Sequence, residues 1–363
     1  MTNEVKNVPE LRFPEFEDEW VEKPLKDMVD VRSGKDYKHL NKGCYPVYGT
    51  GGYMISVDEY LYDGDAIGIG RKGTINKPYF LKGPFWTVDT LFYCVPKKND
   101  TYFILNLFKN INWKIYDEST GVPSLSKVTI NKIQRKVPAN EEQQKIGDFF
   151  SKLDRQIELE EQKLAKLEAQ KKGYMQKIFS QQLRFKNENG DAFPIWEESK
   201  LKEISNIKKG EQINKENITV NGKYYHLNGG ITPSNRTNLY NTNSYTISIS
   251  EGGNSCGFVK MNKEYFFSGG HNYTLLDLLI NKHYLYTFLK YHEKNIMSLR
   301  VGSGLPNIQK KDISNYLIYI PCEKEQEKIG EFFNNLDEFI GKQSNKIELL
   351  KERKKGFLQK MFV

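Results

Sequence analysis

The sequence lacks the features that would place it in a membrane or give it a metal centre. Its 363 residues contain no run near the roughly 18 apolar residues that a membrane-spanning helix needs, and residues 1–16 are too polar for a signal peptide. The four cysteines (Cys44, Cys94, Cys256, Cys322) form no Cys-x-x-Cys pair, and the five histidines show no metal-ligand spacing. We therefore expect a cytoplasmic protein with reduced thiols, no membrane partner and no metal site.

Motifs of the common enzyme classes are missing as well. The sequence has no GxxxxGK[ST] phosphate loop, no His-Glu-x-x-His pair, no Gly-x-Ser-x-Gly elbow and no Asn/Asp-Pro-Pro-aromatic tetrapeptide of amino-methyltransferases. Residues 68–73 match Gly-x-Gly-x-x-Gly, but the next segment has the pattern of a strand, whereas a dinucleotide site needs a helix there. We find no catalytic residues and predict a chain that recognises its ligand without transforming it.

Basic and aromatic residues are plentiful. Lysine and arginine number 54 against 46 acidic residues, which gives a net charge of +8, and there are 22 tyrosines and 21 phenylalanines. A cationic surface attracts polyanions such as DNA or RNA. A lysine-rich composition is also common in soluble proteins that bind no nucleic acid, so charge alone leaves both interpretations open.

The chain contains a long internal repeat. Residues 142–154 return with small changes as residues 325–337, and residues 171–179 return as residues 354–362, both after 183 positions. An internal repeat of this kind has to be recognised before other fold assignments, because it sets the domain organisation. It predicts two copies of one module, each followed by the same helix.

The repeated segments have a heptad pattern of apolar residues. In each copy these residues are spaced alternately four and three positions apart, which is the period of a coiled-coil seam. The seam residues are Ile146, Phe150, Leu153 and Ile157 in the first copy, and Ile329, Phe333, Leu336 and Ile340 in the second. Two further seam positions are polar in both copies, Lys171 with Lys354 and Glu160 with Gln343, which favours a pairing with a specified register.

Two arrangements are compatible with these helices. Each could lie separately on its own module as an amphipathic helix, or the two could pair with each other. About 37 residues form a helix of roughly 55 Å, longer than an ordinary globular domain requires. We therefore favour an antiparallel coiled coil with one module at each end.

The modules themselves have mixed helical and strand patterns. Short β-type runs, for example at 66–69, 79–81, 91–95, 245–249 and 265–267, alternate with turns rich in Gly, Asn and Asp, and helical segments are expected near 102–108 and 282–291. The predicted fold class is α+β, with two similar α/β modules around curled antiparallel sheets, joined by two long helices and related by a pseudo-twofold repeat. The expected boundaries are 1–140 and 183–322 for the modules, and 141–182 and 323–363 for the helices.

The loops keep a common frame in both copies while their side chains change. Residues 45–52 correspond to 224–230, residues 69–74 to 249–254, and residues 119–124 to 302–307. Glycines recur at these turns, next to Arg, Lys, Thr, Asn and Tyr, which are the side chains that contact phosphates and base edges. Turns that only connect strands would explain the glycines but not the divergence of the other residues.

Together these features resemble the specificity subunits of type I restriction-modification enzymes. The resemblance rests on Pro-x-x-x-Glu-Gln-x-Lys-Ile at 138–146 and 321–329, on Gly-x-Pro at 121–123 and 304–306, and on Gly-Arg-Lys-Gly-Thr at 70–74. It covers the whole chain. The second module departs from it, because Glu251 stands where the first module has a basic turn. Either this loop has no phosphate role, or the second half-site has a different chemistry.

The resemblance implies two target-recognition domains, each reading one half of an asymmetric, gapped site on double-stranded DNA. It implies that the helices act as a spacer and dock two modification subunits that carry S-adenosylmethionine and methylate adenine N6. Translocating restriction subunits, which need ATP and Mg, can join that assembly. On this basis the chain itself is non-catalytic and binds none of these cofactors.

Candidate DNA-contacting residues follow from the loops. In the first module they are Tyr48, Thr50, Arg71, Lys72, Thr74 and Ser124, and in the second they are Asn228, Asn254, His271, Asn272, Ser303 and Asn307. Two alternatives remain open at this point. One is an enzyme, a nuclease or a fused methyltransferase, and the other is a DNA-binding scaffold or regulator that has no methyltransferase partner.

Overall fold

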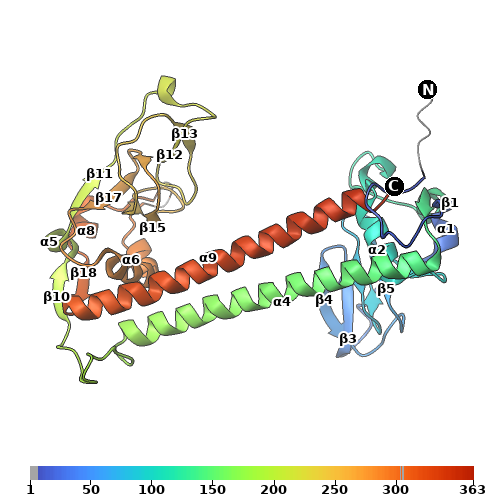
Figure 1. Cartoon of the computed structure of the whole chain (residues 1–363), viewed down its shortest axis with the longest axis horizontal. Coiled ribbons are helices and arrows are strands. Elements are labelled where there is room, and N and C mark those ends of the chain that lie inside the picture. Colours follow the sequence, from blue (N-terminus) through green and yellow to red (C-terminus); the bar gives the residue numbers. More distant parts are fainter. Residues whose placement is uncertain (1–6, 303, 305) are drawn as a thin grey trace. The chain divides into compact units, whose positions relative to one another are not determined.

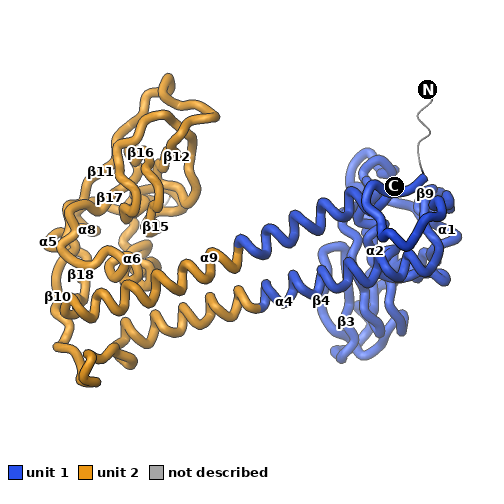
Figure 2. Tube along the Cα trace, viewed as in Figure 1, with its two compact units in different colours: residues 1–162, 345–363 blue, residues 163–344 orange. Residues whose placement is uncertain are grey.

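The computed structural model describes residues 7–302, 304 and 306–363. The chain divides into two compact units, shown in blue and orange in Figure 2. Unit 1 comprises the residues up to 162 together with 345–363, and unit 2 comprises residues 163–344. Among the described residues, no helix combines the length and the apolar character that a bilayer crossing requires.

The described part of unit 1 contains three small sheets and several short helices (Figure 1). In chain order its elements are β1 (Val21–Pro24), α1 (Leu25–Met28), β2 (Val29–Ser33), β3 (Lys42–Gly49), β4 (Gly52–Val57), β5 (Ala66–Gly70), β6 (Tyr79–Leu81), β7 (Trp86–Thr87), β8 (Leu91–Pro96), α2 (Thr101–Asn110), η1 (Trp113–Tyr116), α3 (Lys127–Lys132) and β9 (Gln134–Val137). The long helix α4 (Asn140–Phe179) follows and is divided between the units.

Unit 2 repeats this order with small additions. Its elements are β10 (Glu197–Lys200), α5 (Leu201–Ile204), β11 (Asn206–Lys209), η2 (Lys215–Asn217), β12 (Tyr224–Leu227), β13 (Asn235–Thr237), β14 (Thr246–Ser250), β15 (Val259–Asn262), β16 (Phe266–Ser268), β17 (Asn272–Leu276), α6 (Lys282–Tyr291), α7 (Glu293–Ser298), α8 (Lys310–Ser314) and β18 (Leu317–Ile320). The long helix α9 (Glu323–Lys360) ends the sequence of elements.

The sheets of the two units have the same topology. The four-stranded sheet has the order β2-β8-β5-β6 in unit 1 and β11-β17-β14-β15 in unit 2, and all its neighbours are antiparallel. The three-stranded sheets β4-β3-β7 and β13-β12-β16 each add one parallel pair, which the sequence did not predict. The prediction of two similar α/β modules from the internal repeat is confirmed.

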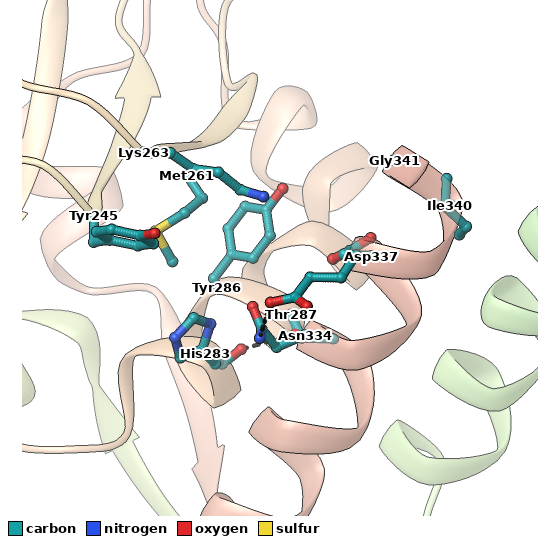
Figure 3. Close-up of a pocket in the computed structure, with 11 residues that line it drawn as sticks. Tyr245, Met261, Lys263, His283, Tyr286, Thr287, Asn334, Asp337, Ile340 and Gly341 are labelled. Atoms are coloured by element: carbon teal, nitrogen blue, oxygen red, sulfur yellow. Dashed lines mark hydrogen bonds between the residues drawn. The ribbon is translucent and has the colours of Figure 1, made fainter. Parts of the chain in front are cut away.

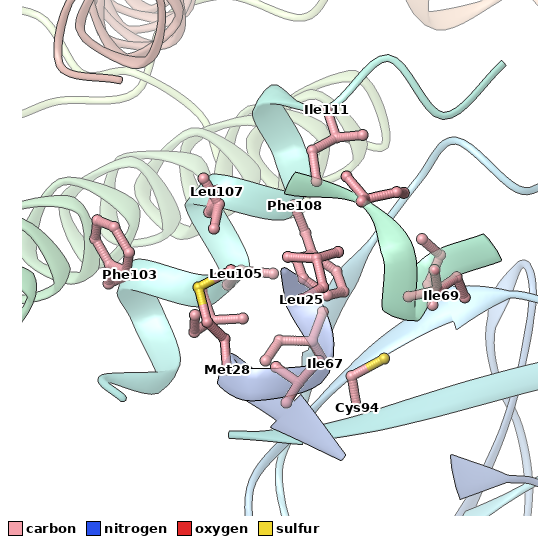
Figure 4. Packing of buried hydrophobic residues seen from close by; sticks show 14 of the residues in the cluster. Leu25, Met28, Ile67, Ile69, Cys94, Phe103, Leu105, Leu107, Phe108 and Ile111 are labelled. Atoms are coloured by element: carbon pink, nitrogen blue, oxygen red, sulfur yellow. The ribbon is translucent and has the colours of Figure 1, made fainter. Parts of the chain in front are cut away.

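A continuous apolar core fills unit 1 between α1, α2 and one face of the four-stranded sheet. Figure 4 shows Phe103, Leu105 and Phe108 of α2 near Leu25 of α1 and Ile67 of β5. The helix α2 begins at Thr101, because the side chain of Asp100 accepts a hydrogen bond from the backbone of Phe103, 2.7 Å away, as an N-cap. This packing fixes the sheet, and the loops at the ends of its strands depend on it.

The repeated Pro-x-x-x-Glu-Gln motif begins each long helix. Glu142 is buried and accepts two hydrogen bonds from Arg12, at 2.8 and 2.7 Å, and Glu325 accepts two from Arg184, at 3.1 and 2.5 Å. The following glutamine donates to the proline carbonyl, as Gln143 does in the first copy at 3.0 Å. The motif therefore fastens each helix to the start of its own module by a bidentate ion pair.

Within each unit the segments of α4 and α9 run antiparallel. In unit 1 the rings of Phe149 and Phe357 are 5.1 Å apart, and Asp154 pairs with Lys354. In unit 2 the Nζ atom of Lys171 lies 2.5 Å from an oxygen of Asp337. This is the corresponding pair, because Asp337 repeats Asp154 and Lys354 repeats Lys171. The antiparallel pairing predicted from the heptads is confirmed.

The first seam residues of each helix also belong to the module cores. Ile146 and Phe150 lie in the unit 1 core, where Met361 and Phe362 after the end of α9 join them. Ile329 and Phe333 lie in the unit 2 core. Of the later seam residues, Ile157 is buried and Leu153, Leu336 and Ile340 are half-buried.

Candidate nucleic-acid interface

Several loops of unit 1 meet beyond the ends of β3, β5 and β7. The backbone amides of Arg71 and Lys72 donate to the carbonyl of Thr90, at 2.8 and 3.2 Å, and the amide of Gly73 donates to Pro123, at 2.7 Å. The amide of Leu125 donates back to Arg71 at 2.9 Å. These bonds join turns that are far apart in the sequence into one frame, called here the unit 1 loop frame (residues 48–52, 71–74, 87–90 and 119–125).

Glycine is required at the tightest point of this frame. Gly73 has a φ of +92°, a left-handed conformation that side chains rarely adopt. The corresponding residue of unit 2, Gly253, has a φ of +75°. The glycines recur because both turns need the same backbone geometry.

The predicted residues of the first module gather at this frame. Arg71 and Lys72 are exposed, whereas Tyr48, Thr50, Thr74 and Ser124 are half-buried. The guanidinium of Arg71 lies over the ring of Phe92, 5.9 Å from its centroid, and reaches the carbonyl of Asp89 at 3.4 Å. The frame thus presents two cationic side chains beside hydroxyl groups, a set that can bind phosphates and base edges.

Unit 2 builds the same frame with different side chains. The amide of Glu251 donates to His271 at 3.0 Å, that of Gly253 to Pro306 at 2.9 Å, and that of Ile308 to Glu251 at 2.9 Å. These three bonds correspond one by one to those of Arg71, Gly73 and Leu125. The unit 2 loop frame comprises residues 227–230, 250–254, 268–272 and 306–307 among those described.

The predicted residues of the second module have different surroundings. Asn254 and His271 are exposed, Asn307 is half-buried, and the Asn228 side chain is half-buried and accepts a hydrogen bond from the His271 amide at 3.1 Å. Asn272 is buried in β17 and donates to Ser268 at 3.0 Å, so its side chain supports the sheet. Ser303 lies outside the described residues.

Sequence reasoning identified Glu251 as a departure of the second module but missed the partners of its side chain at the centre of the unit 2 loop frame. The carboxylate of Glu251 is buried and lies 2.6 Å from Nζ of Lys209. Tyr273 donates to it at 2.8 Å, and burial, together with this hydrogen bond, raises the pKa of Tyr273. The signal in the sequence was the replacement of Arg71 by Glu251, but only the strand register places Lys209 and Tyr273 next to it.

Apolar side chains are exposed near the frames and were also missed. On β4, next to the turn that carries Thr50, Tyr53 and Met54 are 63% and 50% exposed. In unit 2, Leu239 and Tyr240 follow the corresponding strand β13 and are about as exposed. Aromatic and apolar groups beside basic ones can contact sugars and thymine methyl groups.

Unit 2 also has a cavity of about 400 Å³ beside the helices α6 and α9 (Figure 3). His283 and Tyr286 of α6 and Asp337 of α9 are among the residues that line it. Burial, with nearby Lys282 and Lys263, lowers the pKa of His283. The hydroxyl of Thr287, also in α6, donates a hydrogen bond to the backbone carbonyl of His283 at 2.7 Å.

The described part of the chain shows no cluster of metal-binding side chains. The described residues contain no group of three or more His, Cys, Asp or Glu side chains close enough to hold a metal ion. The charged groups of the two loop frames are instead suited to binding an anionic ligand by charge and hydrogen bonds.

Comparison with known proteins gives the family. The family described as "Type I restriction modification DNA specificity domain" matches residues 17–169 and 195–352. Two proteins described as type I specificity subunits, from Mycoplasma genitalium and Mycoplasma pneumoniae, are each 34% identical over 171 residues. The matched region is 46% of this chain and 44% and 45% of those relatives, so the chain spans less than half of their length.

Solved structures show the same fold. The crystal structure of a type I restriction-modification system S subunit from M. genitalium has a TM-score of 0.77 at 19% identity, covering 98% of this chain and 99% of that one. The family match falls on both modules and on most of both long helices, and it accounts for the repeated topology. This chain belongs to the family of type I restriction modification DNA specificity domains.

Proposed function

We propose that the chain recognises double-stranded DNA as the specificity subunit of a type I restriction-modification complex. The observation that carries this proposal is the pair of loop frames, in which the backbone hydrogen bonds repeat while the exposed side chains differ. A shared frame with exchanged side chains is suited to reading two different sequences in the same manner. Each module therefore reads one half of a bipartite, gapped site, and the site is asymmetric because Arg71 and Glu251 occupy equivalent positions.

In this proposal the modules are 1–140 and 183–322, and the helices of 141–182 and 323–363 have two further roles. They set the spacing between the half-sites, and they dock two methyltransferase subunits. Exposed apolar side chains on these helices, such as Phe339 at 59% and Leu349 at 54%, support a docking role. The methyltransferase subunits bring S-adenosylmethionine and modify adenine N6 after flipping the base, and restriction subunits with ATP and Mg join through them.

Mapping of N6-methyladenine by long-read sequencing, in host DNA with and without the gene, tests the proposal. We expect an asymmetric gapped motif that disappears when the gene is deleted. An unchanged methylome would overturn the proposal in favour of a DNA-binding regulator without methyltransferase partners.

Variants of the unit 1 loop frame make the test specific to residues. Replacing Arg71 and Lys72 with alanine should weaken duplex binding and lower the slope of log K against log salt by about 1–2. The matched control is Lys23→Ala, an exposed lysine of the same unit on β1. A slope that changes as little in the double variant as in the control would refute phosphate contact by Arg71 and Lys72.

A further inference from the structure

We propose that unit 2 contacts DNA phosphates through Lys209 and His271, with the buried carboxylate of Glu251 holding both side chains in position. The inference rests on the proposed DNA recognition and names the residues that take the place of Arg71 in the second module. Glu251 is a positioning residue in this arrangement, since its side chain is only 5% exposed, while those of Lys209 and His271 are 51% and 58% exposed.

The equivalence of the two sites follows from hydrogen-bond register. Lys209 of β11 pairs with Tyr273 of β17, as Ser33 of β2 pairs with Phe92 of β8. The amide of Glu251 donates to the carbonyl of His271, as the amide of Arg71 donates to Thr90. The strand pairing and the backbone hydrogen bonds therefore match four positions of unit 2 to four positions of unit 1 without a sequence alignment.

The residues at all four positions differ in charge or hydrogen-bonding groups between the two units. Unit 1 has Ser33, Arg71, Thr90 and Phe92, and unit 2 has Lys209, Glu251, His271 and Tyr273 in their places. In unit 1 the only ionised group of the four is the exposed Arg71. In unit 2 the turn carries an acid, Glu251, and the basic residues Lys209 and His271 occupy two of the other positions.

The acid of unit 2 depends on its partners. With the unit 1 residues Ser33 and Phe92 in the places of Lys209 and Tyr273, a buried carboxylate at position 251 would lose both of its donors, which is costly. The hydroxyl of Tyr273 supplies one donor at 2.8 Å, and the ammonium of Lys209 supplies another at 2.6 Å. The second carboxylate oxygen, Oε2, has no hydrogen-bond partner among the described residues and lies 3.7 Å from Nδ1 of His271.

This geometry directs the donors outward. When a histidine is protonated, a carboxylate facing its Nδ1–H leaves Nε2–H free for another acceptor. An ammonium that gives one N–H to Glu251 keeps two. The carboxylate of Glu251 has only hydrogen-bond acceptors and is repelled by phosphate. It can therefore hold Lys209 and His271 in position but cannot itself bind a phosphate. The ring of His271 faces Oε2 of Glu251, and the backbone amide of His271 donates to the side-chain oxygen of Asn228.

The salt dependence of DNA binding tests the inference. The probe is a labelled duplex that carries the mapped methylation motif, titrated with the full chain over a range of NaCl concentrations. Lys209→Ala should weaken binding and lower the slope of log K against log salt by about 0.9, the contribution of one phosphate contact. His271→Ala should also weaken binding to this duplex.

The control is Lys208→Ala. Lys208 is the neighbouring residue on β11, has the same charge and similar exposure, and pairs with Glu211 at 3.0 Å instead. Its removal should leave the slope unchanged. Equal slopes for Lys208→Ala and Lys209→Ala, in a chain that still binds the duplex, would overturn the inference and leave the proposed function standing. If the unaltered chain does not bind the duplex, the proposed function fails and the inference fails with it.

A double-mutant cycle tests the positioning role of Glu251. If Glu251 aims Lys209 at the DNA, the loss caused by Lys209→Ala should shrink several-fold in a Glu251→Gln background. An undiminished loss would mean that Glu251 only stabilises the fold. Because Glu251→Gln could also impair folding, a second variant transfers the whole unit 1 set (Lys209→Ser, Glu251→Arg, His271→Thr, Tyr273→Phe). This fourfold variant should bind non-specific duplex with a salt slope close to that of the unaltered chain. The single variant Glu251→Arg should have a clearly different slope. If instead the single variant keeps the slope and the fourfold variant changes it, the coupling of the four residues is refuted.

Discussion

The ion pair at the start of α4 provides a quantitative test of how each long helix is attached to its module. We consider Glu142→Gln, which keeps the shape of the side chain and removes its charge. The Glu142 side chain is 2% exposed and that of Arg12 is 13% exposed, so the substitution leaves a largely buried guanidinium without its counter-ion. Breaking a buried pair from one side costs about 3–5 kcal/mol.

The structure narrows this range. Arg12 keeps a hydrogen bond to the carbonyl of Asp18 at 2.6 Å and retains some access to water. We therefore expect the low end of the range, about 3 kcal/mol of unfolding free energy. The repeat supplies a second site for comparison, in which Glu325 also accepts a hydrogen bond from Trp196 at 3.0 Å, whereas the indole nitrogen of the equivalent Trp20 has no hydrogen-bond partner among the described residues.

Glu325→Gln should consequently cost more than Glu142→Gln, by about 1–2 kcal/mol, because one more donor loses a charged acceptor. Urea unfolding of the full chain, followed by circular dichroism at several urea concentrations, measures both. Lys145→Ala is the control, since Lys145 pairs with Glu15 in an exposed pair at 2.8 Å and its loss should cost less than about 1 kcal/mol. A value for Glu142→Gln equal to that control, or larger than that for Glu325→Gln, would refute the reasoning.

Two further predictions concern unit 1. Burial, with the nearby charge of Lys354, lowers the pKa of Lys109 to about 8. Between about pH 8 and 10.5 the unfolded chain therefore binds more protons than the folded chain. The free energy of unfolding should rise with pH in that window, by at most about 3 kcal/mol. Lys109→Met should abolish this rise in pH-dependent urea unfolding, and an identical profile in both proteins would contradict it. Phe150 is fully buried in the unit 1 core, so Phe150→Ala should cost about 3–5 kcal/mol. Leu159→Ala, at a position of the same helix that is 48% exposed, should cost less than about 0.5 kcal/mol by the same measurement, and equal costs would contradict the assigned burial.

Much of the fold could be predicted from the sequence because its signals are local or periodic. The helical segments expected near 102–108 and 282–291 correspond to α2 and α6, and the expected strands correspond to β5, β6, β8, β14 and β16. The parallel pair of β3 with β7 could not be predicted, since the two strands are separated by other elements and pair through backbone groups that every sequence has. Asn272 was predicted to contact DNA, but its buried side chain lies in β17 and donates to Ser268.

The sequence by itself determined the doubled organisation, and it favoured an antiparallel pairing of the long helices. Both features follow from repeats in the sequence. An apolar residue at every third or fourth position gives a helix one apolar face, which packs against a partner helix. The tertiary structure decided the chemistry of the loop frames. Lys209, Glu251 and Tyr273 are 42 and 22 positions apart along the chain and meet only through β-sheet register, in which a shift of one residue would turn each side chain to the opposite face. The sequence therefore shows that there are two recognition modules, and the fold decides which residues act together in each.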